Sequence, residues 1–183
     1  MNVIQLEELI KSVDKGKSTQ DSLNKLIGTF ACSKNPDVQS FLHVKAFESE
    51  NRQFVRTYLV VDNGKIVGYF SLRVDNFEFD KEVSGRLKEI MTGNRKADSF
   101  TSILIAQLGR SDEYKGIVSG KEILQRALDN CRVITQYVGG LRSAVVEYDD
   151  KPALHKFYIQ ENGFKVIRKN PDNNKIIAGI RFN

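Results

Sequence analysis

An amphipathic helix between two apolar strands is the feature that most constrains how this chain can fold. Residues 101–109 read TSILIAQLG, a nearly continuous apolar run, and residues 141–148 read LRSAVVEY. The segment between them, SGKEILQRALDNCRVITQYV, places its apolar residues at the spacing of one helical face. This order predicts a β-α-β unit whose strands are buried on both faces of a sheet.

The sequence also marks where that helix starts and stops. Ser119 is followed three residues later by Glu122, directly before the apolar helical pattern, and this spacing is a capping box. Gly139 and Gly140 follow the last apolar residues and are typical of a helix end. We therefore expect the helix to begin at Gly120 and to stop before the second apolar strand.

A hairpin and further helices are predicted before this unit. Asn35 and Pro36 suit the N-cap and first position of a helix. Residues 55–74 hold two β-rich runs around Asn63-Gly64, a dipeptide that favours a tight type I′ turn. Segments with apolar residues at helical spacing are 22–30, 35–47 and 80–91.

The C-terminal part predicts a short helix and a second hairpin. Residues 152–162 read as a helix that ends at Gly163, and the strand candidates 164–169 and 175–182 follow, joined by the turn-forming NPDNN. A chain of 183 residues with 40% hydrophobic content can bury one sizeable core. The fold class expected is α/β: a mixed sheet with flanking helices and a C-terminal hairpin, in a single domain over residues 1–183.

Cysteine use and hydropathy favour the cytoplasm. Cys32 and Cys131 lie far apart, there is no signal-like apolar N-terminus, and no apolar run has transmembrane length. We expect a reduced protein without membrane contact, with both cysteines acting as small buried hydrophobic residues. Lys and Arg exceed Asp and Glu by 28 to 23, which is compatible with a polyanionic partner, although the basic residues are dispersed.

The glycines before the long helix indicate an anion site or a plain turn. Gly116, Gly120 and Lys121 resemble a Walker loop, but only three residues separate the glycines, and Glu122 replaces the hydroxyl that would bind Mg²⁺. The stretch is instead a helix N-terminus, where free N–H groups and the helix dipole favour a pyrophosphate. Lys115 adds charge. These residues alone leave a strand-to-helix turn without a ligand equally open.

Several segments together resemble the GNAT family of acetyl-CoA-dependent N-acetyltransferases. They are the first hairpin, the strand ending in QLGRSDEYKG, the glycine-containing turn before the long helix, SAVVEY, and LHKFYIQENGF. The resemblance spans roughly residues 27–169. Within the family, FACSKNPDVQSFL, YLVVDNGKIVGYFSL and LIAQLGR are most similar to the GNAT toxins, which are encoded beside small antitoxins and acetylate aminoacyl-tRNA. A sister branch of these toxins fits equally well.

The resemblance implies acetyl-CoA as the cosubstrate. In the family, backbone N–H groups of the pattern Q/R-x-x-G-x-G/A hold the pyrophosphate, and here the pattern runs from Lys115 to Gly120 with Val118 in place of the middle glycine. The end of the apolar strand pairs with the pantetheine arm. The residues expected to contact the cosubstrate are Gln107, Leu108, Arg110, Lys115, Gly116, Val118, Ser119, Gly120 and Lys121. Arg110 could equally contact an anionic acceptor or be an ordinary exposed loop residue.

The resemblance also assigns two catalytic roles. Tyr158 matches the tyrosine beside the sulfur of coenzyme A that serves as general acid, and its ordinary pKa near 10 keeps it protonated at neutral pH. From the residues alone, Tyr158 could also be a core aromatic on a short amphipathic helix. The backbone N–H of Leu108 is the donor expected to polarise the acetyl carbonyl. Four residues separate Tyr158 from Gly163, where the family has three.

No residue is an evident general base or metal ligand. Glu147, Asp149 and Asp150 could take the proton of the amine through water, but the same residues form an ordinary acidic loop, and the amine could arrive neutral. His43 and His155 are isolated, and no C-x-x-C or H-x-x-x-H spacing exists. We expect no metal site.

Two functions follow from these observations. The first is direct acetyl transfer from acetyl-CoA to a primary amine on aminoacyl-tRNA, a protein or a small molecule. An antitoxin is then an expected partner, and the protein is expected to be a monomer or a homodimer. The alternative is a catalytically degenerate protein of the same fold that binds coenzyme A or a protein partner, because Val118, Lys151 and the extra residue before Gly163 depart from the family pattern.

Overall fold

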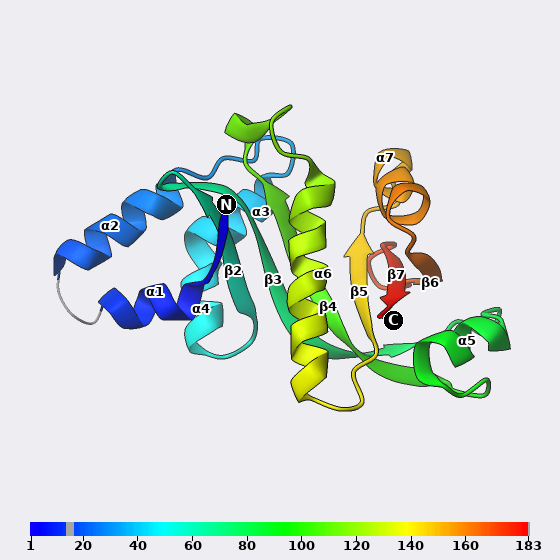
Figure 1. The fold of residues 1–183 in the computed structure, drawn as a ribbon. Helices are drawn as coiled ribbons and strands as arrows, with labels where there is room; N and C mark the ends of the chain where they lie inside the picture. Colours follow the sequence, from blue (N-terminus) through cyan, green and yellow to red (C-terminus); the bar gives the residue numbers. More distant parts are fainter. Residues whose placement is uncertain (14–16, 183) are drawn as a thin grey trace. The chain divides into compact units, whose positions relative to one another are not determined.

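The sheet observed in the structure is mixed, as the sequence predicts. The computed structural model describes residues 1–13 and 17–182. In these residues the strands hydrogen-bond in the order β1-β2-β3-β4-β5-β7-β6 (Figure 1). Strands β4 and β5 pair in parallel, and the pairs β1–β2, β2–β3, β5–β7 and β6–β7 are antiparallel. The α/β fold class is therefore confirmed.

Two compact units make up the chain. The first comprises Met1–Arg73 and Ala106–Ala127, and the second comprises Val74–Ile105 and Leu128–Asn183. Strands β3 (Lys65–Glu78) and β4 (Ser99–Arg110) and helix α6 (Gly120–Tyr137) contribute residues to both units. Each unit is described by itself below, and the single domain over residues 1–183 stays a prediction.

The first unit begins with a strand that the sequence did not indicate. Strand β1 (Asn2–Gln5) pairs antiparallel with β2 (Arg56–Asp62), and β2 turns into β3. At the turn, Asn63 and Gly64 have φ angles of 47° and 73°. Both positive values match a type I′ turn, which confirms the predicted hairpin.

Helices of the first unit pack on this hairpin. Helices α1 and α4 contact β2 and each other, as Figure 1 also shows. Helix α3 starts with Pro36 after Asn35, as predicted, but Asn35 makes no side-chain cap hydrogen bond. The core of this unit includes Leu6, Phe30, Leu42, Leu59 and Tyr69. The helical segments are α1 (Leu6–Val13), α2 (Lys17–Gly28), α3 (Pro36–Ser40), the π-helix η1 (Phe41–Lys45) and α4 (Ala46–Asn51).

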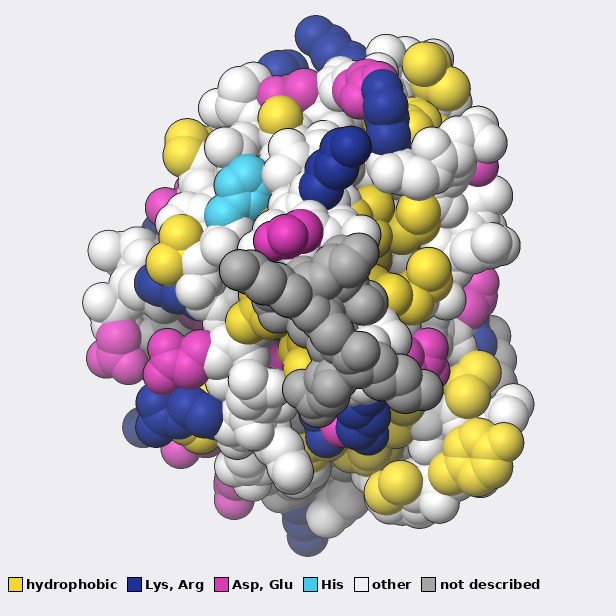
Figure 2. Space-filling view, turned by 90° about the vertical axis from the view of Figure 1, so that its left-hand side faces the viewer, with side chains coloured by type: hydrophobic (Ala, Val, Ile, Leu, Met, Phe, Trp, Pro, Cys, Tyr) yellow, Lys and Arg dark blue, Asp and Glu magenta, His cyan; other side chains and the backbone are white. Residues whose placement is uncertain are grey.

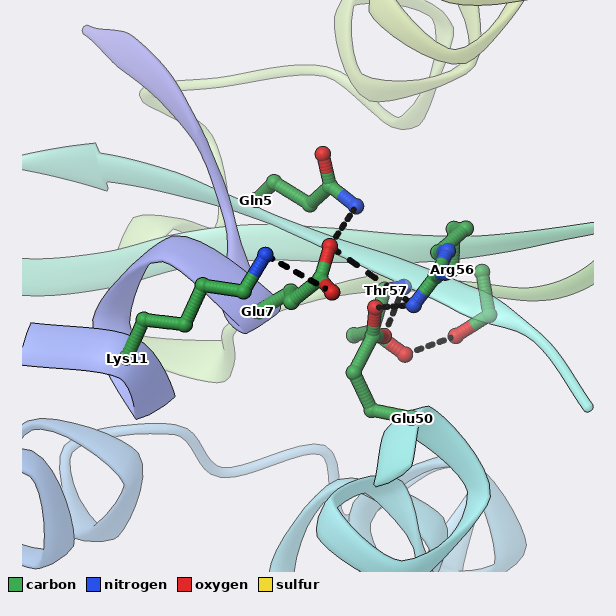
Figure 3. Close-up of polar contacts among 7 residues, drawn as sticks. Gln5, Glu7, Lys11, Glu50, Arg56 and Thr57 are labelled. Carbon is green, nitrogen blue, oxygen red and sulfur yellow. Dashed lines mark hydrogen bonds and ion pairs between the residues drawn. The ribbon is translucent and has the colours of Figure 1, made fainter. Parts of the chain in front are cut away.

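A buried carboxylate joins α4 to β2 (Figure 3). The side chain of Glu50 is only 1% exposed, and it accepts hydrogen bonds from Arg56 Nη1 at 3.0 Å and from the N–H of Thr57 at 2.7 Å. Strand β1 pairs with β2 only as far as Tyr58, so Glu50 supplies the acceptor that β1 does not reach. Glu7 Oε2 lies 3.7 Å from Arg56 Nη1, and Glu7 Oε1 forms an ion pair with Lys11 Nζ at 3.0 Å.

Two glycines allow a close approach between β3 and β4 in the first unit. A Cβ atom on Gly68 would lie 2.6 Å from the carbonyl oxygen of Gly109 and 2.8 Å from Ile123 Cδ1. A Cβ atom on Gly109 would lie 2.5 Å from Val38 Cγ1 and 3.1 Å from Phe30 Cζ. The end of β4 therefore packs against its neighbours in a way that only glycine permits.

We expect Gly68→Ala to lower the free energy of unfolding by about 1–3 kcal/mol, because the added methyl group meets a backbone oxygen that cannot rotate away. Gly28→Ala is the matched control, since a Cβ atom there meets nothing within 4 Å. That variant should be as stable as the wild type or slightly more stable. Denaturant unfolding of both variants measures the difference, and equal midpoints would show that β3 and β4 can separate at no cost.

The second unit contains the remaining strands and helices. Helix α5 starts at Gly85 and not at residue 80, because Ser84 caps it by accepting a hydrogen bond from the N–H of Leu87. Met91 on α5 lies close to Gly179 of β7. The elements of this unit are α5 (Gly85–Thr92), β5 (Ser143–Tyr148), α7 (Pro152–His155), the π-helix η3 (Lys156–Glu161), β6 (Lys165–Lys169) and β7 (Ile176–Arg181). The antiparallel pair β6–β7 is the predicted C-terminal hairpin.

The buried thiol of Cys131 predicts a loss of stability at alkaline pH. Burial raises the pKa of Cys131 from 9.0 to about 12. The unfolded chain loses this proton first, so the stabilisation is complete below pH 9 and is lost toward pH 12, by about 1.4 kcal/mol per pH unit. We expect the free energy of unfolding to fall from pH 9 to 10, and to fall less steeply in Cys131→Ala. An equal slope in that variant would assign the effect to other groups.

Candidate active site

The N-terminus of α6 is capped by its own side chains, as predicted. The N–H of Glu122 donates to Ser119 Oγ at 3.1 Å, and the N–H of Ser119 donates to Glu122 Oε2 at 2.7 Å. The hydrogen bond from Ser119 lowers the pKa of the Glu122 carboxyl group. The helix begins at Gly120, and the N–H groups of Gly120 and Lys121 lie in its first turn, where no intrahelical acceptor exists.

The side chain of Val118 points into the protein. It is 5% exposed, its N–H donates to the carbonyl oxygen of Tyr114 at 3.0 Å, and its own carbonyl oxygen accepts from Arg110 Nη1 at 3.0 Å. The β-branched side chain therefore does not cover the exposed side of the turn, where Lys115 and Gly116 lie. Gly116 has a φ of 82°, a conformation that L residues rarely adopt.

Unpartnered polar atoms lie where β4 leads into this turn. Among the described residues, Arg110 Nε and Ser111 Oγ are buried and have no hydrogen-bond partner. Buried polar groups are almost always paired, with protein atoms or with ordered water, and both of these atoms are shielded from solvent. The guanidinium group of Arg110 is hydrogen-bonded to the turn at Val118, next to the free N–H groups of the first turn of α6. A helix N-terminus with a guanidinium group beside it fits a pyrophosphate chemically.

The end of β4 is held in place by backbone contacts within the first unit. The N–H of Ser111 donates to Val67, and the N–H of Asp112 donates to Ala31, both at 2.8 Å. The carboxylate of Asp112 accepts from the N–H of Ser33 at 2.7 Å. Gln107 and Leu108, the expected partners of the pantetheine arm and the acetyl group, lie partly buried just before this anchored end.

Tyr158 belongs to the second unit and lies in η3. A π-helical turn closes with one residue more than an α-helical turn. This geometry accommodates the extra residue between Tyr158 and Gly163: the N–H of Phe164 donates to the carbonyl oxygen of Tyr158 at 3.0 Å, and Gly163 has a φ of 74°. Burial raises the pKa of Tyr158 above its ordinary value of 10.0, so its hydroxyl group keeps its proton at neutral pH.

The acidic residues in the last part of β5 and directly after it are paired with other side chains. Asp149 contacts Lys151 Nζ at 2.8 Å, and Asp150 contacts Lys169 Nζ at 3.0 Å. Glu147 accepts from the amide groups of Asn170 at 2.9 Å and Asn173 at 2.8 Å. These contacts hold the loop together, and none of the three carboxylates stands apart as a free base.

Further properties of the described residues concern metal-binding groups, apolar helices and surface charge. Within residues 1–13 and 17–182, no three His, Cys, Asp or Glu side chains gather into a group that could hold a metal ion. No described helix has both the length and the apolar character required to cross a membrane. On the face drawn in Figure 2, basic, acidic and hydrophobic side chains of the described residues are interspersed.

The sequence assigned the cosubstrate residues to one stretch of chain, and the structure adds neighbours that the sequence did not reveal. Positions from Gln107 to Lys121 all fall in the first unit, where the side chain of Arg110 donates a hydrogen bond to the carbonyl oxygen of Val118. Gly68 and Ser111 were missed, because a single glycine within a strand and a single serine after a strand carry no distinctive signal. The paired glycines of β3 and β4 become visible only when the strands are neighbours.

Solved structures similar to this chain include several toxins. No protein-family model matches the chain, and no curated protein is significantly similar in sequence. A structure described as a bacterial toxin has a TM-score of 0.67 and 17% identity, covering 83% of this chain and 80% of its own. AtaT complexed with acetyl-methionyl-tRNAfMet has a TM-score of 0.66 and 17% identity, covering 82% and 85%. A mutant of KacT has a TM-score of 0.64 and 18% identity, covering 82% and 85%.

TM-scores of this size at 17–18% identity show a shared architecture, and they do not show a shared chemistry. The resemblance to the GNAT toxins that the sequence indicated is confirmed for the fold. The chain has the fold of the GNAT toxins AtaT and KacT.

Proposed function

We propose that this protein transfers the acetyl group of acetyl-CoA to a primary amine. The observation that carries the proposal is the start of α6, where the N–H groups of Gly120 and Lys121 have no intrahelical acceptor and Arg110 is hydrogen-bonded to Val118 of the adjoining turn. The fold supports it, because AtaT has been solved with acetyl-CoA. Structures of AtaT and of KacT also carry a tyrosine-to-phenylalanine substitution, the change that removes a phenolic hydroxyl group.

The first unit would bind the cosubstrate. The N–H groups of Gly120 and Lys121 and the side chain of Arg110 would hold the pyrophosphate at the positive end of the α6 dipole. Lys115 and Lys121 are exposed and add positive charge. The N–H of Leu108 would donate to the acetyl carbonyl oxygen as negative charge develops on it.

The reaction exchanges one bond and one proton. The amine nitrogen attacks the thioester carbonyl carbon, the carbon–sulfur bond breaks, the amine loses a proton and the departing sulfur gains one. Tyr158 would donate that proton, because its raised pKa keeps the hydroxyl protonated. The proton that the amine releases after its attack would return through water to the phenolate and restore Tyr158. Since Glu147, Asp149 and Asp150 are engaged in other contacts, the amine would arrive neutral. Acceptors with a low amine pKa are therefore favoured.

The α-amino group of an aminoacyl-tRNA meets this requirement. An α-amino group has an ordinary pKa near 8, about two units below that of a lysine side chain. AtaT has been solved with acetyl-methionyl-tRNAfMet and with the C-terminus of its antitoxin AtaR. By analogy with these two AtaT complexes, aminoacyl-tRNA is the proposed acceptor of this protein, and an antitoxin is its proposed protein partner.

One observation favours the alternative, a degenerate protein that binds coenzyme A or a protein partner without turnover. The N–H groups of Val118 and Ser119 already donate to Tyr114 and Glu122. Two donors of the turn are therefore engaged within the chain, which leaves fewer for a pyrophosphate.

Release of free thiol from acetyl-CoA separates the two functions. The protein is mixed with acetyl-CoA and, in parallel, with aminoacyl-tRNA, a lysine peptide or a small polyamine. We expect thiol release that depends on the acceptor and is fastest with aminoacyl-tRNA. Binding of acetyl-CoA without release in any mixture would establish the degenerate alternative, and absence of binding would reject the anion site as well.

A further inference from the structure

The ring of Tyr158 lies in an aromatic cluster of the second unit. Its centroid lies 4.8 Å from that of Tyr148 with an interplanar angle of 29°, a stacked arrangement. Phe157 and Phe164 meet the same ring edge-on, at 4.9 Å and 5.7 Å. Tyr158 is 8% exposed and Tyr148 is 5% exposed. The plane of the Tyr158 ring is therefore fixed by its neighbours.

Tyr148 is itself held from two sides. Its backbone is at the end of β5, where it pairs with Ile176 of β7, and its hydroxyl oxygen lies 3.4 Å from Nδ1 of His155 in α7. The ring that stacks on Tyr158 is thus anchored to the sheet at one end and to α7 at the other.

We propose that Tyr148 is a positioning residue for the hydroxyl group of Tyr158, through the stack of the two rings. This inference rests on the proposed function, in which Tyr158 donates a proton. A phenolic oxygen lies on the axis of its ring, so turning the ring about that axis leaves the oxygen in place, and only the direction of the axis (the χ1 torsion) moves it. The stack on Tyr148 and the edge contacts of Phe157 and Phe164 hold that direction. A displacement of about 1 Å at a reacting group can cost up to about 10²-fold in rate. Tyr148 acts through its ring, and its own hydroxyl group serves only the contact to His155.

Two substitutions separate the ring from the hydroxyl group. Tyr148→Leu removes the stack, and we expect kcat for acetyl transfer to fall about 10–100-fold with little change in KM for acetyl-CoA. Tyr148→Phe keeps the stack, and we expect it to restore kcat to within about 3-fold of the wild type, because it loses only the contact to His155. Wild-type kcat in Tyr148→Leu, or an equal loss in both variants, would overturn the inference.

A measurement without substrate keeps this test separate from that of the proposed function. The χ1 rotamer of Tyr158, measured from three-bond couplings by NMR of selectively labelled tyrosine, should be averaged over more than one rotamer in Tyr148→Leu and stay single in Tyr148→Phe. An unchanged single rotamer in Tyr148→Leu would refute the positioning role even in a folded, active protein. Absence of acetyl transfer in the wild type, with the expected change in rotamer, would refute the proposed function alone.

Discussion

Replacing Tyr158 with phenylalanine is expected to lower kcat for acetyl transfer by about 10²–10⁴-fold, the range that positioned general acids contribute. The substitution removes one oxygen atom and leaves the ring that stacks on Tyr148. Folding should be retained, because the aromatic contacts that bury the side chain remain. Binding of acetyl-CoA should change little, since the residues proposed to hold its pyrophosphate are unchanged in this variant. Thiol release measures kcat, and calorimetry measures binding.

Tyr137→Phe is the matched control for this prediction. Tyr137 is 83% exposed at the end of α6, so the loss of its hydroxyl group should leave turnover unchanged. Because burial raises the pKa of Tyr158, ionisation of this residue should not reduce kcat at any pH below its ordinary value of 10.0. Full turnover in Tyr158→Phe would remove Tyr158 from the mechanism.

Local signals in the sequence predicted the elements that depend on few residues. The capping box of Ser119 and Glu122 fixed the start of α6, since both hydrogen bonds form within four residues. The turn at Asn63-Gly64 was equally local, because it depends on residues that tolerate positive φ. The apolar runs around α6 predicted the parallel pair β4–β5 through burial alone.

Elements that depend on distant partners could not be predicted in this way. Strand β1 has four residues, and it exists because β2 offers it a ladder of hydrogen bonds more than fifty positions away. The π-helical turn η3 has no pattern of its own, because its extra residue is tolerated only where Gly163 and Phe164 complete the packing. For the same reason, the stack of Tyr148 on Tyr158 could not be read from their spacing of ten residues.

The buried carboxylate of Glu50 is the clearest case of a residue that the sequence conceals. In a sequence, the helix AFESEN shows two glutamates two positions apart, and either would be assigned to solvent. The structure exposes Glu48 and buries Glu50 beneath Arg56 and the N–H of Thr57. The difference arises because the pairing of β1 with β2 stops at Tyr58. The backbone N–H of Thr57 therefore has no acceptor on β1, and the side chain of Glu50 accepts its hydrogen bond.

Glu50→Ala is therefore expected to lower the free energy of unfolding by about 2–4 kcal/mol. The variant leaves the N–H of Thr57 buried without an acceptor, which costs about 1–3 kcal/mol, and it removes the partner of Arg56. The loss stays below the roughly 3–5 kcal/mol of a fully buried pair, because Arg56 is 34% exposed and retains Glu7 nearby. Glu48→Ala, on the same helix and 70% exposed, should change stability by no more than about 0.5 kcal/mol. Denaturant unfolding of both variants gives the comparison, and equal losses would mean that the burial of Glu50 contributes nothing.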